Sequence, residues 1–165
     1  MTLRPLAALF ASMLVLPAFA QDNGAVAANI DAMYPKLDAI YKDLHAHPEL
    51  AFQEVRTAGK LAAEMRAIGF EVTEKVGKTG IVAVYKNGPG PTVLVRTEMD
   101  GLPMEEKSGF DYSSRAHAQL DGKDTMVAHS CGHDVHMTAW LATARTLVAM
   151  KSQWKGTLMF IGQPA

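Results

Sequence analysis

The sequence has one cysteine, Cys131, among 165 residues, so no disulfide can form within a single chain. It has no Asn-x-Ser/Thr pattern for N-glycosylation and no Gly-x-Ser-x-Gly motif of the kind that carries the nucleophile of serine hydrolases. Acidic and basic side chains nearly balance, with 17 Asp/Glu against 16 Lys/Arg and a net charge of −1. Because there is no basic stripe, nucleic acid is not an expected partner.

The only long apolar run lies at the start, in the pattern of an export signal. Arg4 gives a positive beginning, residues 6–18 are nearly all apolar, and Ala-Phe-Ala at 18–20 offers the small residues that signal peptidase requires. The run is too short for a comfortable membrane span, and polar residues follow from Gln21. We therefore expect residues 1–20 to be a cleaved signal peptide, the protein to be periplasmic or secreted, and no membrane contact after cleavage.

An exported protein with one thiol needs a reason for that thiol other than an intramolecular disulfide. The octapeptide His-Ser-Cys-Gly-His-Asp-Val-His at 129–136 holds the cysteine and four other side chains that can bind metal. If its first part is extended, His129, Cys131 and His133 point to one side, because side chains alternate along a strand, and His136 could face the same cavity. This pattern predicts a metal site. The alternative is a loop with solvated histidines and a buried free cysteine.

A second group of candidate site residues follows an apolar, β-forming run at 92–97, which we predict to be a buried strand. Glu98 and Asp100 are two residues apart, so an extended backbone would place them on one side. Active-site residues of α/β sheets commonly follow the carboxyl ends of strands; a solvated loop is the alternative. Glu105 and Glu106 are predicted to be surface charges.

The remaining pattern predicts an α/β layered domain formed by residues 21–165. The polar segment 108–124 is predicted to be an irregular loop, and His45 and His47 to cap or pack at a helix end. Apolar residues at three-to-four spacing predict helices, and β-forming runs predict strands. The predicted helices are 30–44, 54–68 and 135–150, and the predicted strands are 70–75, 81–85, 92–97 and 154–162.

The motifs together resemble the amino-terminal part of an M20-type metallopeptidase. The resemblance is to the branch of aminoacylases, hippurate hydrolases and auxin-conjugate hydrolases, and it covers nearly all of the chain after residue 20. The Cys-Gly-His-Asp element is specific to this branch. Four stretches carry the match, in the family's order: Leu-His-Ala-His-Pro-Glu-Leu at 44–50, Arg-Thr-Glu-Met-Asp-Gly-Leu-Pro at 96–103, Ala-His-Ser-Cys-Gly-His-Asp-Val-His at 128–136, and Gly-Thr-Leu-Met-Phe-Ile-Gly-Gln-Pro-Ala at 156–165.

The resemblance implies a three-layer α/β catalytic domain with two divalent metal ions (Zn, Mn, Co or Ni), of which residues 21–165 are a truncated part. The family's inserted dimerisation domain, and with it the expected homodimer, lies outside this chain. Cys131 and His133 are implied as metal ligands, and Asp100 as the acidic residue that supports the site. The general base is implied to be the first of two glutamates after Gln-Pro-Ala. Small departures are Glu98, where aspartate is common, and Gly101, where alanine is common.

The function implied for the whole protein is hydrolysis of amide bonds in N-acyl amino acids or small peptides. The 165-residue chain alone is expected to be inactive, because the base and several ligands would follow Ala165. One alternative is a non-catalytic, truncated metal-binding relic. A further alternative is a buried structural cysteine with no metal, for which replacement of Cys131 by serine would leave the metal content unchanged.

Overall fold

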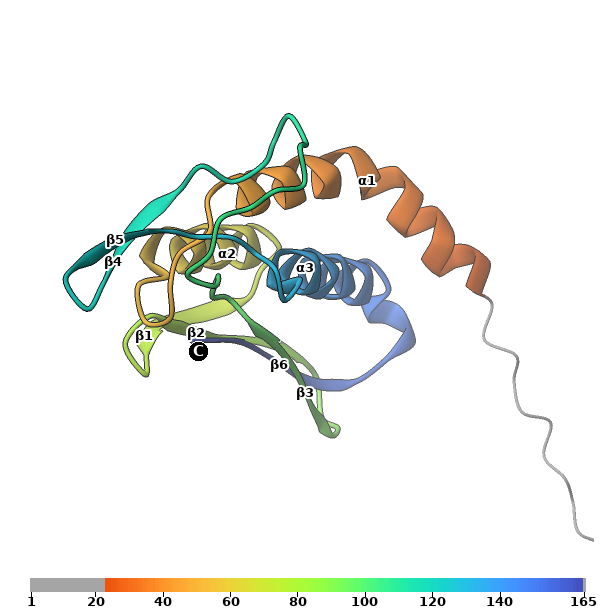
Figure 1. Ribbon diagram of the computed structural model, residues 1–165. Helices are drawn as coiled ribbons and strands as arrows, with labels where there is room; N and C mark the ends of the chain where they lie inside the picture. The colour runs from red at the N-terminus through yellow and green to blue at the C-terminus, as the bar shows by residue number, and fades with distance from the viewer. Residues whose placement is uncertain (1–22, 165) are drawn as a thin grey trace, which may run out of the picture.

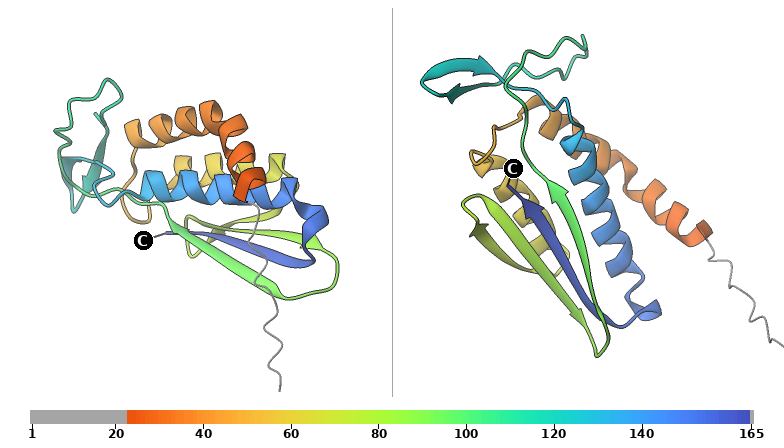
Figure 2. Two further views of the ribbon diagram at one scale, coloured as in Figure 1. Left: turned by 90° about the vertical axis from the view of Figure 1, so that its right-hand side faces the viewer. Right: turned by 60° about the horizontal axis from the view of Figure 1, so that its bottom comes forward.

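A computed structural model describes residues 23–164, which form three layers: a β-sheet, two helices on one of its faces, and a third helix outside them (Figures 1 and 2). The helices are α1 (Asn23–Ala46), α2 (Val55–Ala67) and α3 (His133–Ala149), with a short 3-10 helix η1 (Lys151–Gln153). The strands are β1 (Glu71–Val76), β2 (Gly80–Asn87), β3 (Thr92–Glu98), β4 (His117–Leu120), β5 (Lys123–Met126) and β6 (Gly156–Gln163).

The main sheet has the strand order β1-β2-β6-β3. β2 pairs antiparallel with β1 and β6, whereas β3 and β6 are parallel. Parallel pairing of β3 with β6 requires a crossover, and α3 lies in it. The carboxyl ends of β3 and β6 therefore lie side by side at the same end of the sheet, where Glu98 and Gln163 are register partners.

The core lies between the sheet and helices α2 and α3, while α1 packs on α3 on the side away from the sheet (Figure 2). Trp140 and Phe160 contact edge to face in this core, with ring centroids 5.3 Å apart. The indole N–H of Trp140 donates to the carbonyl of Val95, which ties α3 to β3. The fully buried side chains include Leu44, Leu61, Met65, Ile81, Met99, Met137, Leu141 and Phe160. The predicted α/β layered domain is confirmed.

Two sequence predictions about the strands are corrected. β3 is not buried: Val93 and Leu94 are about half exposed, because β3 is an edge strand of a sheet whose helices cover one face only. The segment predicted to be a loop at 108–124 contributes a two-stranded hairpin, β4–β5. Its turn at Asp121 and Gly122 has positive φ at both positions, which suits a tight hairpin turn.

The predicted signal peptide, residues 1–20, lies outside the described residues, so its cleavage and the periplasmic or secreted location stay predictions. Among residues 23–164, no helix has the length and apolar character needed to cross a membrane.

Candidate metal centre

The candidate centre lies where the carboxyl end of β3 meets the first turn of α3. β3 ends at Glu98, and the chain continues through Asp100 to Leu102, which forms a bridge with Ala128. α3 begins at His133, after Gly132 turns the backbone with a φ of 77°. This positive φ favours glycine. Glu98 and His133, which are 35 residues apart in the sequence, are thus brought to one place.

His133 and Asp100, both predicted site residues, contact each other. His133 Nδ1 lies 3.0 Å from the Asp100 carbonyl oxygen and 3.0 Å from its carboxylate Oδ1. Both oxygens act as acceptors, so Nδ1 donates the hydrogen, and Nε2 is the ring nitrogen that is left to bind a metal. A histidine held in this way by a carboxylate or carbonyl is the usual arrangement of a metal-binding imidazole. The contact brings the two predicted site residues together, and their roles stay predictions.

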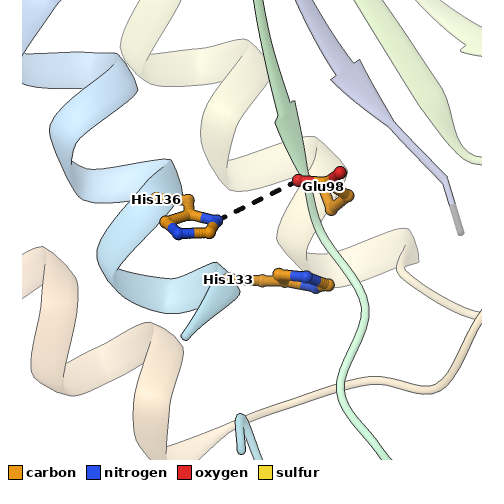
Figure 3. A group of neighbouring side chains, drawn as sticks. All are labelled: Glu98, His133 and His136. Carbon is orange, nitrogen blue, oxygen red and sulfur yellow. Dashed lines mark ion pairs between the residues drawn. The ribbon is translucent and has the colours of Figure 1, made fainter. Parts of the chain in front are cut away.

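Three side chains offer donor atoms at metal-binding separation in the described part of the chain: Glu98, His133 and His136 (Figure 3). One donor atom from each lies within 4.8 Å of the other two. His133 and His136 are three residues apart on α3, so they share a helix face, and their ring centroids are 5.8 Å apart. The Glu98 carboxylate lies opposite, with Oε2 4.0 Å from His136 Nδ1. Two imidazoles and a carboxylate suit a divalent transition-metal ion.

The charge on Glu98 is favoured by its surroundings. Burial opposes ionisation, but its own backbone N–H, Arg96 and His133 outweigh burial and lower the pKa of Glu98. The carboxylate is therefore ionised at neutral pH, as a metal ligand must be.

Cys131, predicted as a metal ligand, lies in a turn with its side chain exposed and is not part of this three-residue group. The backbone at 129–133 does not have the extended form on which a one-sided arrangement would depend, because the Gly132 N–H donates to the His129 carbonyl and closes a turn. The three side chains therefore do not share one side: His129 is buried and Cys131 faces solvent. The exposure of Cys131 contradicts the alternative of a buried structural cysteine.

His129 is buried, and neither of its ring nitrogens has a partner among the described residues. Burial lowers the pKa of this imidazole, which is therefore neutral. It lines a small cavity of about 200 Å³ together with His45, Glu106, Ser108, Ala128 and Ser130.

A second polar cluster lies on the other side of α3. His45, at the end of α1, contacts Asp134 through Nδ1 at 2.6 Å and Glu106 through Nε2 at 2.9 Å. The Glu106 side chain is only 9% exposed, so its predicted place on the surface is wrong. The sequence did not reveal this contact, since His45 and Glu106 are 61 residues apart. His47 donates to the carbonyl of Asp43, as predicted for a histidine at a helix end.

Comparison with known proteins identifies the family. Residues 94–165 match the model of peptidase family M20/M25/M40. A Synechocystis protein named "Probable hydrolase sll0100" is 40% identical over 135 residues, which are 81% of this chain and 32% of that protein. The chain belongs to peptidase family M20. This confirms the resemblance found in the sequence.

Two further M20 relatives come from Bacillus subtilis. N-acetylcysteine deacetylase is 37% identical over 81% of this chain and 34% of its own length. The crystal structure of the YXEP protein, described as a dinuclear metal-binding peptidase, matches this M20 chain with a TM-score of 0.72 and 33% identity. The match covers 82% of this chain and 36% of that structure. The chain thus spans about a third of the length of the curated relatives it matches, and its fold agrees with an M20 catalytic domain.

Proposed function

We propose that the whole protein is an exported, metal-dependent hydrolase of amide bonds in N-acyl amino acids or small peptides. The observation that carries the proposal is the His133–Asp100 contact at the carboxyl end of β3, beside further metal donors, in an M20 chain. A relative named as an N-acetylcysteine deacetylase supports an N-acyl amino acid as the substrate class.

The cofactor in this proposal is a pair of divalent ions, chosen from Zn, Mn, Co and Ni. The relative described as a dinuclear metal-binding peptidase supports the number. Within this chain, His133 and Cys131 would be ligands, and the set of imidazole, thiolate and carboxylate fits such ions. Bound divalent ions supply Lewis acidity, which activates water and stabilises the negative charge that develops on the amide oxygen.

The residues of this chain have distinct parts in the proposed chemistry. Asp100 holds the Nδ1 hydrogen of His133 and so presents Nε2. The Glu98 carboxylate is ionised and adds negative charge where a cation would bind. The proton transfer to the leaving amine is assigned, by resemblance to the family, to a glutamate after Ala165. We propose accordingly that residues 1–165 alone do not turn over substrate, and that the whole protein is a homodimer.

The test begins with the gene sequence beyond the codon for Ala165, followed by expression of the longest reading frame that contains the chain. That product should release free amine from N-acetyl and N-benzoyl amino acids, lose this activity on chelation, and regain it with Zn²⁺, Mn²⁺, Co²⁺ or Ni²⁺. The 165-residue chain should be inactive in the same assay. Hydrolysis that resists the chelator would contradict the proposal. If the product of the longest reading frame binds metal but hydrolyses no amide, the alternative of a non-catalytic metal-binding relic is favoured.

A further inference from the structure

A turn between α1 and α2 holds a phenylalanine in a backbone conformation that favours glycine. The Gln53 N–H donates to the Leu50 carbonyl at 2.9 Å, which closes a β-turn with Phe52 at its third position. Phe52 has a φ of 60°, and a turn position with positive φ is usually occupied by glycine or asparagine. The Phe52 ring is 45% exposed, so packing in the core does not account for a bulky side chain there. Backbone strain of this kind clusters at functional sites.

A lysine of the β1–β2 turn lies over the same ring. Lys78 Nζ is 5.5 Å from the centroid of the Phe52 ring, which is a cation–π separation. Lys78 is exposed and also has a positive φ, of 96°. In the described part of the chain its ammonium group takes part in no ion pair, so its charge is available to a ligand.

The turn that carries Phe52 is fixed beside the candidate centre. Leu50, its first residue, forms a bridge with Gly101, and the Gly101 N–H donates to the Glu49 carbonyl at 2.7 Å. Gly101 directly follows Asp100, which contacts His133. Phe52 is therefore two residues from a backbone contact with the segment that forms the centre.

The β1–β2 turn that carries Lys78 reaches the same end of the sheet. The Thr79 hydroxyl donates to the Glu54 carboxylate at 2.5 Å, which joins this turn to the segment after Phe52. The turn also lies against the carboxyl end of β6, because a Cβ added at Gly80 would be only 2.7 Å from Pro164. Figure 1 shows the loop after α1, the β1–β2 turn and the end of β6 together at this end.

A cation next to an exposed aromatic ring matches the amino-acid part of an N-acyl amino acid. That part carries a carboxylate and a side chain on the same carbon atom. An ammonium group binds a carboxylate through charge-assisted hydrogen bonds, and an aromatic ring packs against an apolar side chain. Because Lys78 and Phe52 contact each other, one amino-acid moiety is able to reach both.

We propose that Phe52 and Lys78 form a substrate-binding site beside the candidate centre, in which Lys78 binds the carboxylate of an N-acyl amino acid and Phe52 packs against its side chain. This inference rests on the proposed amide-hydrolysing function and assigns to it a preference for substrates with a free carboxylate and an apolar side chain. The strained turn holds the ring at the protein surface, where the substrate reaches it.

The experiment measures binding of N-benzoyl-phenylalanine and of its carboxamide to the product of the longest reading frame, by calorimetry after chelation so that no hydrolysis occurs. Lys78→Met should weaken binding of the acid by about 10-fold, the usual effect of losing one contact to a charged group, and leave binding of the carboxamide unchanged. With metal restored, the KM for the acid should rise and kcat should stay the same. The matched control is Lys86→Met, because Lys86 is also exposed but lies toward the opposite end of β2, beside Thr157; its affinities should equal those of the wild type.

The role of Phe52 is tested by separating substrate preference from stability. Phe52→Asn should weaken binding of N-benzoyl-phenylalanine by about 10-fold but not that of N-benzoyl-glycine, which has no side chain to contact the ring. The urea midpoint should change little, because asparagine tolerates positive φ and this relief offsets the lost contacts of a half-exposed ring. A lowered midpoint with an equal effect on both ligands would indicate a merely structural role and overturn the assignment.

The remaining outcomes separate the inference from the proposed function. Unchanged affinity for the acid in Lys78→Met, or no binding of N-benzoyl-phenylalanine by the wild type, would overturn the inference even if the protein hydrolyses other amides. The proposed function fails separately, if the wild type binds the acid with the expected dependence on Lys78 and Phe52 but hydrolyses no amide when loaded with metal.

Discussion

Replacement of His45 by alanine should destabilise the chain far more than the same change at His47, two residues further on. The His45 side chain is 12% exposed and bridges two carboxylates, Asp134 and Glu106, which are 2% and 9% exposed. Its removal leaves two buried negative charges without their shared partner, and breaking a buried ion pair in this way costs about 3–5 kcal/mol. The His47 side chain is 55% exposed and contacts Asp43, so its loss should cost at most about 1 kcal/mol.

The assay is urea unfolding at pH 6, followed by circular dichroism. With an m-value of about 2 kcal/mol/M, the midpoint of His45→Ala should fall by about 2 M and that of His47→Ala by less than about 0.5 M. Two milder variants test each half of the bridge: the amide of His45→Asn can replace the Nδ1 contact to Asp134, and that of His45→Gln the Nε2 contact to Glu106. Each should recover part of the loss. If His45→Ala and His47→Ala unfold within 1 kcal/mol of each other, the bridge is not a stabilising contact.

The same bridge should make the cost of His45→Ala depend on pH. Burial alone would lower the pKa of His45, but the hydrogen bonds to Asp134 and Glu106 outweigh it and raise this pKa. The contribution of His45 is therefore complete below its unfolded pKa of about 6.5 and is lost as the pH rises through the raised value. Burial likewise opposes the charge on Glu106, but Ser108, His45 and the N–H of Ser114 lower its pKa to about 2. That contribution is lost as the pH falls toward 2, so the difference between wild type and His45→Ala should be largest near pH 5–6.5 and should narrow in both directions.

Three other changes test the packing and the exposed thiol. Phe160→Ala removes a fully buried ring from the centre of the sheet and should lower the free energy of unfolding by about 3–5 kcal/mol, as measured in urea. Gly162→Ala should cost about 1–3 kcal/mol in the same assay, because the added Cβ would lie 2.9 Å from Ile81 and 3.0 Å from Met99; a neutral effect would mean that these side chains move aside freely. The metal-free, folded chain should react with a thiol reagent such as DTNB about as fast as the urea-unfolded chain, because Cys131 is exposed, and strong protection would contradict that exposure.

Local pattern was sufficient to predict most of the fold but not the hairpin. The helices and most main-sheet strands follow from period and composition, because their apolar residues pack in the core. β1 is mostly exposed and packs against the core through Val72. Strands β4 and β5 have four residues each and are mostly exposed, so they carry no alternation of apolar and polar residues. Their pairing depends on the turn at Asp121 and Gly122. An Asp-Gly pair is typical of a tight hairpin turn, but the polar composition of the segment favoured the prediction of a loop.

For the candidate centre, the sequence supplied the motifs but not which side chains meet. The two-residue spacing of Arg96 and Glu98 on a strand is the sequence signal for their shared side. The arrangement of His129 and Cys131 could not be predicted by assuming an extended backbone, because the turn that closes at Gly132 separates them. The burial of Glu106 was hidden for another reason: the partners that offset its desolvation include His45, which comes from a distant segment.

The two polar clusters act on one turn of helix from opposite sides. Consecutive residues of a helix point about 100° apart, so His133 and Asp134 cannot face the same neighbour. His133 is held by Asp100 at the end of β3, and Asp134 by His45 at the end of α1. The first turn of α3 is therefore fixed between the sheet layer and the outer helix layer, and this fixes the rotation of α3 about its axis. His136 lies one turn further along the same face of α3 as His133. The contacts that fix the rotation of α3 therefore also turn both histidines toward Glu98, and they do so without a bound ion.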